Sequence, residues 1–239
     1  MPTENTMPPL YKRIYLLTRE RHLDRTFKRN VGFGFAAEVS SLPLTLAEFP
    51  AAARQYPIVF TPGDSPLPVV IVGLKQDHNL FVLEDGSWRA GCYIPAYVRR
   101  YPFMLAVNSG DNQLSLCIDE ESEHYRNGGD VTIFKEDGPT EEIKAALEFC
   151  GDFQNQWTMT AEFGRAMNEA GLLEPKQVNI NYGDDTRTLT GFSLINEAKL
   201  AEIGDAQFIE WRHRGWIGMI YCHLISMGCI QSLAAFERF

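Results

Sequence analysis

Residues 56–83 read YPIVFTPGDSPLPVVIVGLKQDHNLFVL, and this stretch contains three short apolar runs separated by turn residues. The run at 69–74 is continuous and rich in β-branched residues, which is typical of a central strand. Residues 56–60 and 79–83 are similar in character, and 84–87 (EDGS) supplies an Asp-Gly hairpin turn. Because the connections are too short for crossover helices, we predict a mostly antiparallel sheet.

The strand–turn–strand pattern continues through 103–107 (FMLAV), the turn 108–112 (NSGDN) and 114–118 (LSLCI). The apolar period changes near residue 138, where Thr140 is suited to cap a helix that has two glutamates in its first turn. The other elements predicted after this point are a second helix at 160–170, a hairpin formed by 178–181 and 188–194, a short helix capped by Asn196, and two further helices.

These patterns predict an α+β fold, with a mostly antiparallel sheet in the first half and helices plus a β-hairpin in the second half. We expect a single domain over residues 1–239. Its β-rich sub-lobe would cover about 1–138 and its helix-rich sub-lobe about 139–239, since no long linker or internal repeat separates them.

The chain has 31 acidic and 22 basic residues, a formal net charge of −9, which argues against nucleic acid as a partner. Five dispersed cysteines without a C-x-x-C motif favour a reducing compartment. The N-terminus lacks the layout of a signal peptide, and the apolar run at 216–230 is shorter than the roughly 20 residues that a spanning helix needs. We therefore expect a cytoplasmic protein without a transmembrane segment, in which 216–230 is a mostly buried helix.

The most distinctive segment is 88–103, WRAGCYIPAYVRRYPF. Pro102 disfavours helical geometry at the preceding residue, so a short helix here ends by Arg100. Tyrosines at positions 93, 97 and 101 are four residues apart and would share one face of that helix. Two adjacent guanidiniums in an aromatic setting can hold a carboxylate or phosphate by bidentate hydrogen bonds. We interpret five residues as a candidate anion-recognition site bordering the main concavity: Trp88, Tyr93, Tyr97, Arg99 and Arg100.

Other interpretations compete with this one. One or both arginines would instead pair with the acidic residues 119–121, and in an acidic chain we favour this for at least one of them. His22 and Asp24 form an H-x-D pair of the kind that opens some iron sites, but the charged stretch around them is more typical of solvated surface. Cys222, His223 and Cys229 lack zinc-like spacing. We expect no metal or cofactor.

The 88–103 segment resembles the signature of the SapC family of bacterial proteins, a Tyr-Ile-Pro-Ala-Tyr-x-Arg-Arg-Tyr-Pro-Phe run. The family's other landmarks follow in order, among them 56–60 (YPIVF), 117–122 (CIDEES), 138–140 (GPT) and 171–175 (GLLEP). The name of the family derives from surface-layer gene clusters, and its members also lie beside outer-membrane receptor, tryptophan-halogenase-like and cupin-like genes. No catalytic residues are established for it. A peptide-transport permease of the same name is a separate, membrane-spanning protein.

The resemblance and the lack of any recognisable catalytic motif favour a non-catalytic binding or accessory protein, associated with a bacterial surface layer or with nutrient uptake or modification. Its partner would be an anionic small molecule or an acidic protein. One alternative is an enzyme of unfamiliar type, for example a metal-assisted one that uses His22 and Asp24. Another is a purely structural assembly subunit.

Overall fold

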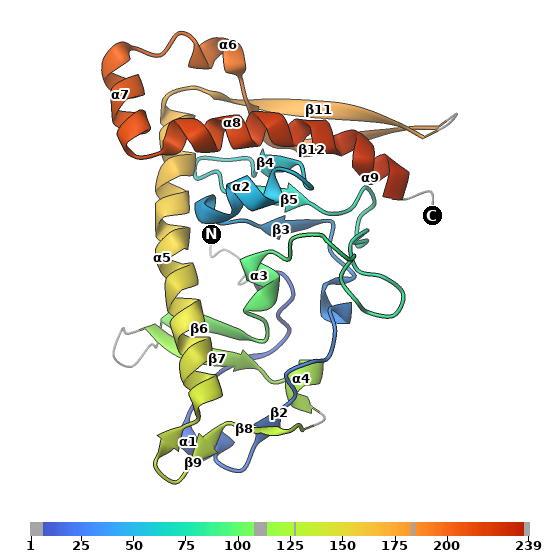
Figure 1. Cartoon of the computed structure of the whole chain (residues 1–239), viewed down its shortest axis with the longest axis vertical. Coiled ribbons are helices and arrows are strands. Elements are labelled where there is room, and N and C mark those ends of the chain that lie inside the picture. Colours follow the sequence, from blue (N-terminus) through green and yellow to red (C-terminus); the bar gives the residue numbers. More distant parts are fainter. Residues whose placement is uncertain (1–6, 108–113, 127, 183–184, 237–239) are drawn as a thin grey trace, which may run out of the picture.

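The computed structural model describes residues 7–107, 114–126, 128–182 and 185–236. Its larger sheet has five antiparallel strands in the order β11-β12-β4-β5-β3 (Figure 1). The bounds of these strands are Leu173–Tyr182, Asp185–Ile195, Ile58–Phe60, Pro68–Ile71 and Ser41–Pro43. The predicted hairpin in the second half therefore exists as β11 and β12, and β12 pairs with β4 through Ser193 and Phe60. Its tip at 183–184 is outside the described residues.

A second, three-stranded antiparallel sheet has the order β1-β7-β6, with bounds Ile14–Leu16, Leu114–Asp119 and Phe103–Val107. The two strands predicted at 103–107 and 114–118 are confirmed, and the turn predicted at 108–112 is outside the described residues. The described residues also form two short strand pairs: β2 (Thr26–Phe27) with β8 (Val131–Thr132), and β9 (Phe134–Lys135) with β10 (Gly138–Pro139). The fold is α+β.

The strand expected at 79–83 is wrong. This segment forms a turn with a single bridge between Val82 and Trp88. Asn79 is the reason, because its side chain forms hydrogen bonds with the backbone of Ala36 and of Phe81. The amide group donates to the carbonyl of Ala36 at 2.9 Å, and the amide oxygen accepts from the N–H of Phe81 at 2.9 Å. Side-chain bonds of this kind replace a strand ladder.

Helix α5, Glu141–Glu169, runs along much of the length of the molecule (Figure 1). It starts directly after Thr140, as predicted, but it is one helix where two were expected. Phe153 is buried in the middle and its ring lies 5.8 Å from that of Trp157, so packing holds the segment that lacks a helical pattern. Thr160 ties the helix to the first half by accepting a hydrogen bond from the backbone N–H of Leu46 at 2.8 Å.

The remaining helices are short. Asn196 caps α6 as predicted, because its side-chain oxygen accepts from the backbone N–H groups of Ala198 and Lys199. The bounds are α1 Arg19–His22, α2 Phe49–Ala52, α3 Ala96–Arg99, α4 Glu123–Arg126, α6 Glu197–Leu200 and α7 Asp205–His213, with 3₁₀ turns at Gly34–Ala36, Leu46–Glu48 and Met227–Cys229.

The C-terminal helices are α8, Trp216–Ser226, and α9, Ile230–Phe236, joined by the last of those 3₁₀ turns. The prediction of a helix at 216–230 is confirmed, but the expectation that it is mostly buried is wrong. Only 33% of the most apolar 18-residue stretch in these helices is buried, and Ile225 is 70% exposed. The segment Trp216–Phe236 is long and apolar enough to cross a membrane, a test that core helices of globular proteins also pass.

Two hydrophobic cores support the two sheets. The larger contains side chains from the five-stranded sheet, α2, α5 and α8, together with Tyr97 and Tyr101 of the 88–103 segment. The smaller lies against the three-stranded sheet and includes Phe27, Phe103 and Cys150. The 88–103 segment contributes to both, so it lies where the cores meet.

Candidate functional site

The 88–103 segment places two consecutive arginines at the end of a single helical turn. Helix α3 spans Ala96–Arg99 and its last cap is Arg100, so the predicted stop by Arg100 is confirmed. Pro95 occupies the N-cap, with φ −55° and an extended ψ of 143°. Because β6 begins at Phe103, Arg99 and Arg100 lie next to the start of a strand of the second sheet.

A buried carboxylate anchors this segment. Glu48 is 6% exposed, and its Oε1 accepts from the hydroxyl of Tyr93 at 2.9 Å and from the backbone N–H of Ala96 at 2.6 Å. Its Oε2 accepts from the backbone N–H and the hydroxyl of Thr45, at 2.9 and 2.8 Å. Burial and the neighbouring Glu48 charge raise the pKa of Tyr93 to about 12. Tyr93 is therefore a positioning group for the segment.

Trp88 and Tyr97 also hold the segment in place. Trp88 donates from its indole Nε1 to the hydroxyl of Tyr56 at 3.2 Å, and that hydroxyl donates to the carbonyl of Tyr93. Tyr97 donates to the carbonyl of Pro9 at 2.7 Å. The expected single stripe of tyrosines does not form, because α3 covers only Ala96–Arg99 and the Tyr93 hydroxyl bonds to Glu48.

The two arginines differ in burial. Arg99 is exposed, and it donates from Nε to the carbonyl of Ile94 at 3.0 Å and from Nη2 to the hydroxyl of Tyr93 at 3.2 Å. Arg100 is only 9% exposed. Its guanidinium carbon lies 4.2 Å from the ring centre of Phe153 and 4.4 Å from that of Tyr97, distances typical of cation–π contacts.

The expected pairing of an arginine with residues 119–121 is wrong. Asp119 is fully buried and accepts hydrogen bonds from three backbone N–H groups, while Glu120 pairs with Arg21. Within the described ranges, neither Arg99 nor Arg100 forms an ion pair with a carboxylate, and the Nε of Arg100 has no hydrogen-bond partner. Asp119 and Glu120 are therefore already engaged by other partners.

Both arginines line a cavity of about 320 Å³, which we call the arginine cavity. It lies between the end of α3, the first turns of α5 and the segments that carry Phe27 and His124. A third arginine, Arg29, faces it and bonds to Glu142 at 2.8 Å. The apolar lining consists of Phe27, Pro102, Phe103, Ala145, Ala146, Phe149 and Cys150, and the polar lining of Arg29, Arg99, Arg100, Tyr101, His124 and Glu142.

The charges in the arginine cavity favour an anion. Three guanidiniums face one carboxylate, although the chain as a whole carries a net charge of −9. Burial lowers the pKa of His124, so this ring is neutral at pH 7. Burial also raises the pKa of the Cys150 thiol to about 11, which leaves it protonated and a poor nucleophile. The cavity therefore offers fixed positive charge without an activated nucleophile.

Of the five candidate residues, the structure brings only Arg99 and Arg100 into the lining of this cavity. The ring of Tyr97 packs against the guanidinium of Arg100, the hydroxyl of Tyr93 accepts from Arg99, and Trp88 lies in the larger core. Sequence reasoning missed Arg29, His124 and Phe149, which come from segments remote in the chain. No sequence pattern marked these three residues as neighbours of the arginine pair.

Within the described ranges, the H-x-D pair is not part of a cluster of metal-ligating side chains. His22 is fully buried, so the interpretation of this stretch as solvated surface is wrong for that residue. Its Nδ1 lies 3.0 Å from the carbonyl of Thr18 and its Nε2 lies 3.2 Å from Oε1 of Glu120. The described part of the chain contains no group of three or more histidine, cysteine, aspartate or glutamate side chains that could hold a metal ion.

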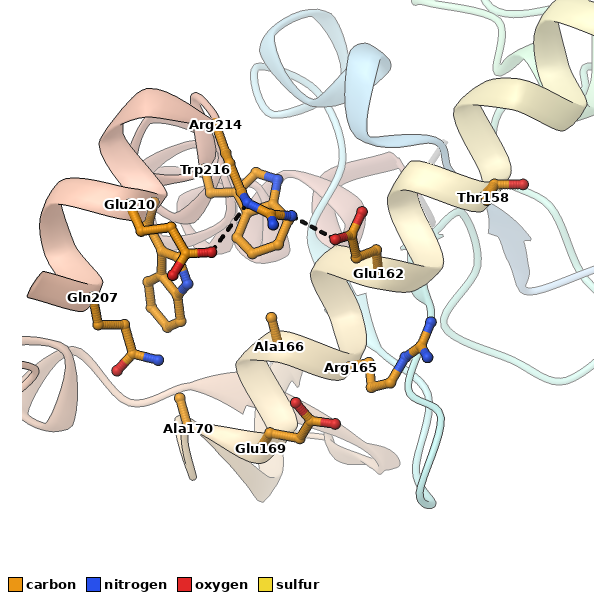
Figure 2. Close-up of a pocket in the computed structure, with 11 residues that line it drawn as sticks. Thr158, Glu162, Arg165, Ala166, Glu169, Ala170, Gln207, Glu210, Arg214 and Trp216 are labelled. Atoms are coloured by element: carbon orange, nitrogen blue, oxygen red, sulfur yellow. Dashed lines mark hydrogen bonds and ion pairs between the residues drawn. The ribbon is translucent and has the colours of Figure 1, made fainter.

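A larger groove, of about 770 Å³, lies between α5 and the α7–α8 turn (Figure 2). Arg214 lies between two carboxylates there, 2.5 Å from Glu162 and 3.2 Å from Glu210. Trp211 and Trp216 border the groove but are 2% and 6% exposed. Because two carboxylates already neutralise Arg214, this groove is a weaker candidate than the arginine cavity. None of the residues 88–103 lines this larger groove, contrary to the expectation that the segment borders the main concavity.

The fold and the cavity define an α+β protein with an arginine-lined, partly apolar cavity and no recognisable catalytic constellation in the described residues. The family model for SapC matches residues 17–233, nearly the whole chain. The protein belongs to the SapC family. A search of curated proteins and a search of solved structures each found no match.

Proposed function

We propose that this SapC protein is a non-catalytic binding or accessory protein that recognises an anionic ligand in the arginine cavity. It would act in the cytoplasm, in association with a bacterial surface layer or with a nutrient-uptake or modification system. The observation that carries the proposal is Arg100, a buried guanidinium that lines a cavity and has no carboxylate partner in the described ranges.

The physical argument concerns the cost of burying a charge. Removing an ion from water costs several kcal/mol unless a partner or good hydrogen bonds replace the water. The rings of Phe153 and Tyr97 offset part of this cost, at roughly 0.5–2 kcal/mol per cation–π contact. A bound carboxylate or phosphate would supply the missing charged acceptor, and arginine holds such groups by two parallel hydrogen bonds.

The surroundings of Arg100 support the same conclusion. Arg99 is exposed and can attract an anion from solution, while the charge of Arg29 in the lining is balanced by Glu142. The volume of about 320 Å³ is near the lower limit of small-molecule sites, which suits one compact acid. The apolar lining would bury the remainder of such a ligand. An acidic side chain of a protein partner has the same head group.

A binding test uses purified protein and two probes, sodium phenylacetate and inorganic phosphate. We expect at least one anion to raise the melting temperature of the native protein and to bind in a calorimetric titration. Arg99→Gln should weaken that binding at least about tenfold, because a hydrogen bond to a charged group contributes roughly 1.5–3 kcal/mol. Arg54→Gln removes the same charge from an exposed position outside the cavity and should leave binding unchanged.

The stability of Arg100→Gln separates binding from a structural role. Because Arg100 has no carboxylate partner in the described ranges, we expect this variant to be at least as stable as the native protein while its affinity for the anion falls. If both arginines served only the fold, the variant would lose stability and keep its binding. That result, or a native protein that responds to neither probe, would refute the proposal.

A further inference from the structure

His124 is a second buried polar group in the arginine cavity that lacks a partner. It lies in α4, is 7% exposed and forms part of the lining. Its Nδ1 lies 2.7 Å from the carbonyl oxygen of Lys28, a residue 96 positions away in the chain. Its Nε2 is buried and has no hydrogen-bond partner in the part of the chain that the structure describes.

The contact with Lys28 determines which nitrogen of His124 carries the proton. A backbone carbonyl can only accept, so Nδ1 must hold the hydrogen that it donates. Burial lowers the pKa of His124, which keeps the ring neutral at pH 7 and leaves Nε2 as a bare lone pair. A buried acceptor without a donor destabilises the free protein.

The other walls show what else a ligand must satisfy. Phe27, Phe103 and Phe149 present apolar surface, and Arg99 and Arg100 present donors for an acid. The remaining titratable groups in the lining are accounted for. Arg29 and Glu142 bond to each other, Tyr101 donates to Asp119, and Cys150 stays a thiol. The cavity thus combines an anion site with an apolar wall, and one of its lining residues, His124, carries a buried acceptor without a partner in the described residues.

Building on the proposed anion recognition, we infer that the ligand is an apolar carboxylic acid that also carries a hydroxyl or N–H donor. The carboxylate would bind Arg99 and Arg100, the apolar body would pack against the phenylalanines, and the donor would bond to Nε2 of His124. His124 is then a specificity-determining residue. An acid of the same shape without a donor would leave Nε2 unpaired and bind more weakly.

The test compares ligands that differ in one group, on the unaltered protein at pH 8. Calorimetry would be run with phenylacetate, with its 3-hydroxy and 4-hydroxy derivatives, and with the uncharged 3-hydroxyphenylethanol. We expect at least one hydroxy acid to bind about fivefold more tightly than phenylacetate, the gain typical of one added hydrogen bond. The uncharged alcohol should bind at least about tenfold more weakly than the matching acid.

The variant His124→Phe removes the acceptor and should abolish the gain from the hydroxyl while phenylacetate binds as before. His213→Phe, at an exposed histidine outside the cavity, is the matched control and should keep the gain. Equal affinity for phenylacetate and both hydroxy acids would overturn the inference and leave anion recognition intact. Binding of phosphate alone would have the same consequence. If neither the acids nor phosphate bind, the proposed function itself fails. The ligand comparison on native protein stands even where His124→Phe does not fold.

Discussion

His223 should make the folded protein lose stability as the pH falls from about 6.5 to about 4. It is fully buried on α8 and joins two strands of the larger sheet. Its Nδ1 donates to the carbonyl of Ile58 at 2.8 Å, and its Nε2 accepts from the backbone N–H of Ile195 at 3.0 Å. Only the neutral ring can do both, since a protonated Nε2 would face another N–H group.

Burial lowers the pKa of His223 from 6.5 to about 4, against the opposing effect of its bond to Ile58. Above pH 6.5 the ring is neutral in both the folded and the unfolded chain, so the pH has no effect through this group. Between 6.5 and 4 the unfolded chain binds a proton that the folded chain does not, and unfolding is favoured. At about 1.4 kcal/mol per pKa unit, the loss reaches roughly 3 kcal/mol by pH 4.

The measurement is the free energy of unfolding in urea between pH 4.5 and 8, followed by tryptophan fluorescence. His223→Gln cannot make both hydrogen bonds of the imidazole, to Ile58 and from Ile195. We therefore expect it to be about 2 kcal/mol less stable than the native protein at pH 7.5. Its free energy of unfolding should change less between pH 6.5 and 4.5. His213→Gln, at an exposed histidine, should keep the native profile. The contribution of His124 to the pH dependence of unfolding is the same in all three proteins, so it cancels in the comparison. A native profile that is flat in this range, or a His223→Gln profile with the native slope, would refute the reasoning.

Two glycines of α5 provide a matched pair of substitutions. A Cβ at Gly164 would lie 2.0 Å from the carbonyl oxygen of Pro66, so Gly164→Ala should lower the free energy of unfolding by about 1–3 kcal/mol. A Cβ at Gly151 meets nothing within 4 Å, so Gly151→Ala should raise it by up to about 1 kcal/mol, and equal effects in urea unfolding would contradict this. Glu48→Gln places an amide donor against existing backbone donors, so we expect the free energy of unfolding to fall by about 2 kcal/mol. A variant with the native melting temperature would show that the carboxylate is not needed.

Residues close together in the chain account for the parts of the fold that were predicted correctly. Asn196 caps α6 because its side chain bonds to backbone groups two and three residues away. Thr140 does occupy the N-cap position of α5, but its hydroxyl donates to the carbonyls of Thr132 and Ile133 instead of capping the helix. The short connections likewise required antiparallel strands. The errors occurred where distant contacts override local preference. Packing around Phe153 carries α5 through a segment without a helical pattern, and Asn79 replaces a predicted strand with side-chain bonds.

The candidate site divides in the same way. The sequence alone determined that two arginines stand together at the end of a short helix among aromatic residues, and it determined the family resemblance. Tertiary structure alone decided that Arg100 is buried without a carboxylate in the described ranges, while Trp88 and Tyr93 hold the backbone. It also decided that His124, fixed by a carbonyl 96 residues away, shares the cavity. The reason is physical, since burial and the choice of partner depend on which remote segments pack around a side chain, and adjacent residues do not specify that packing.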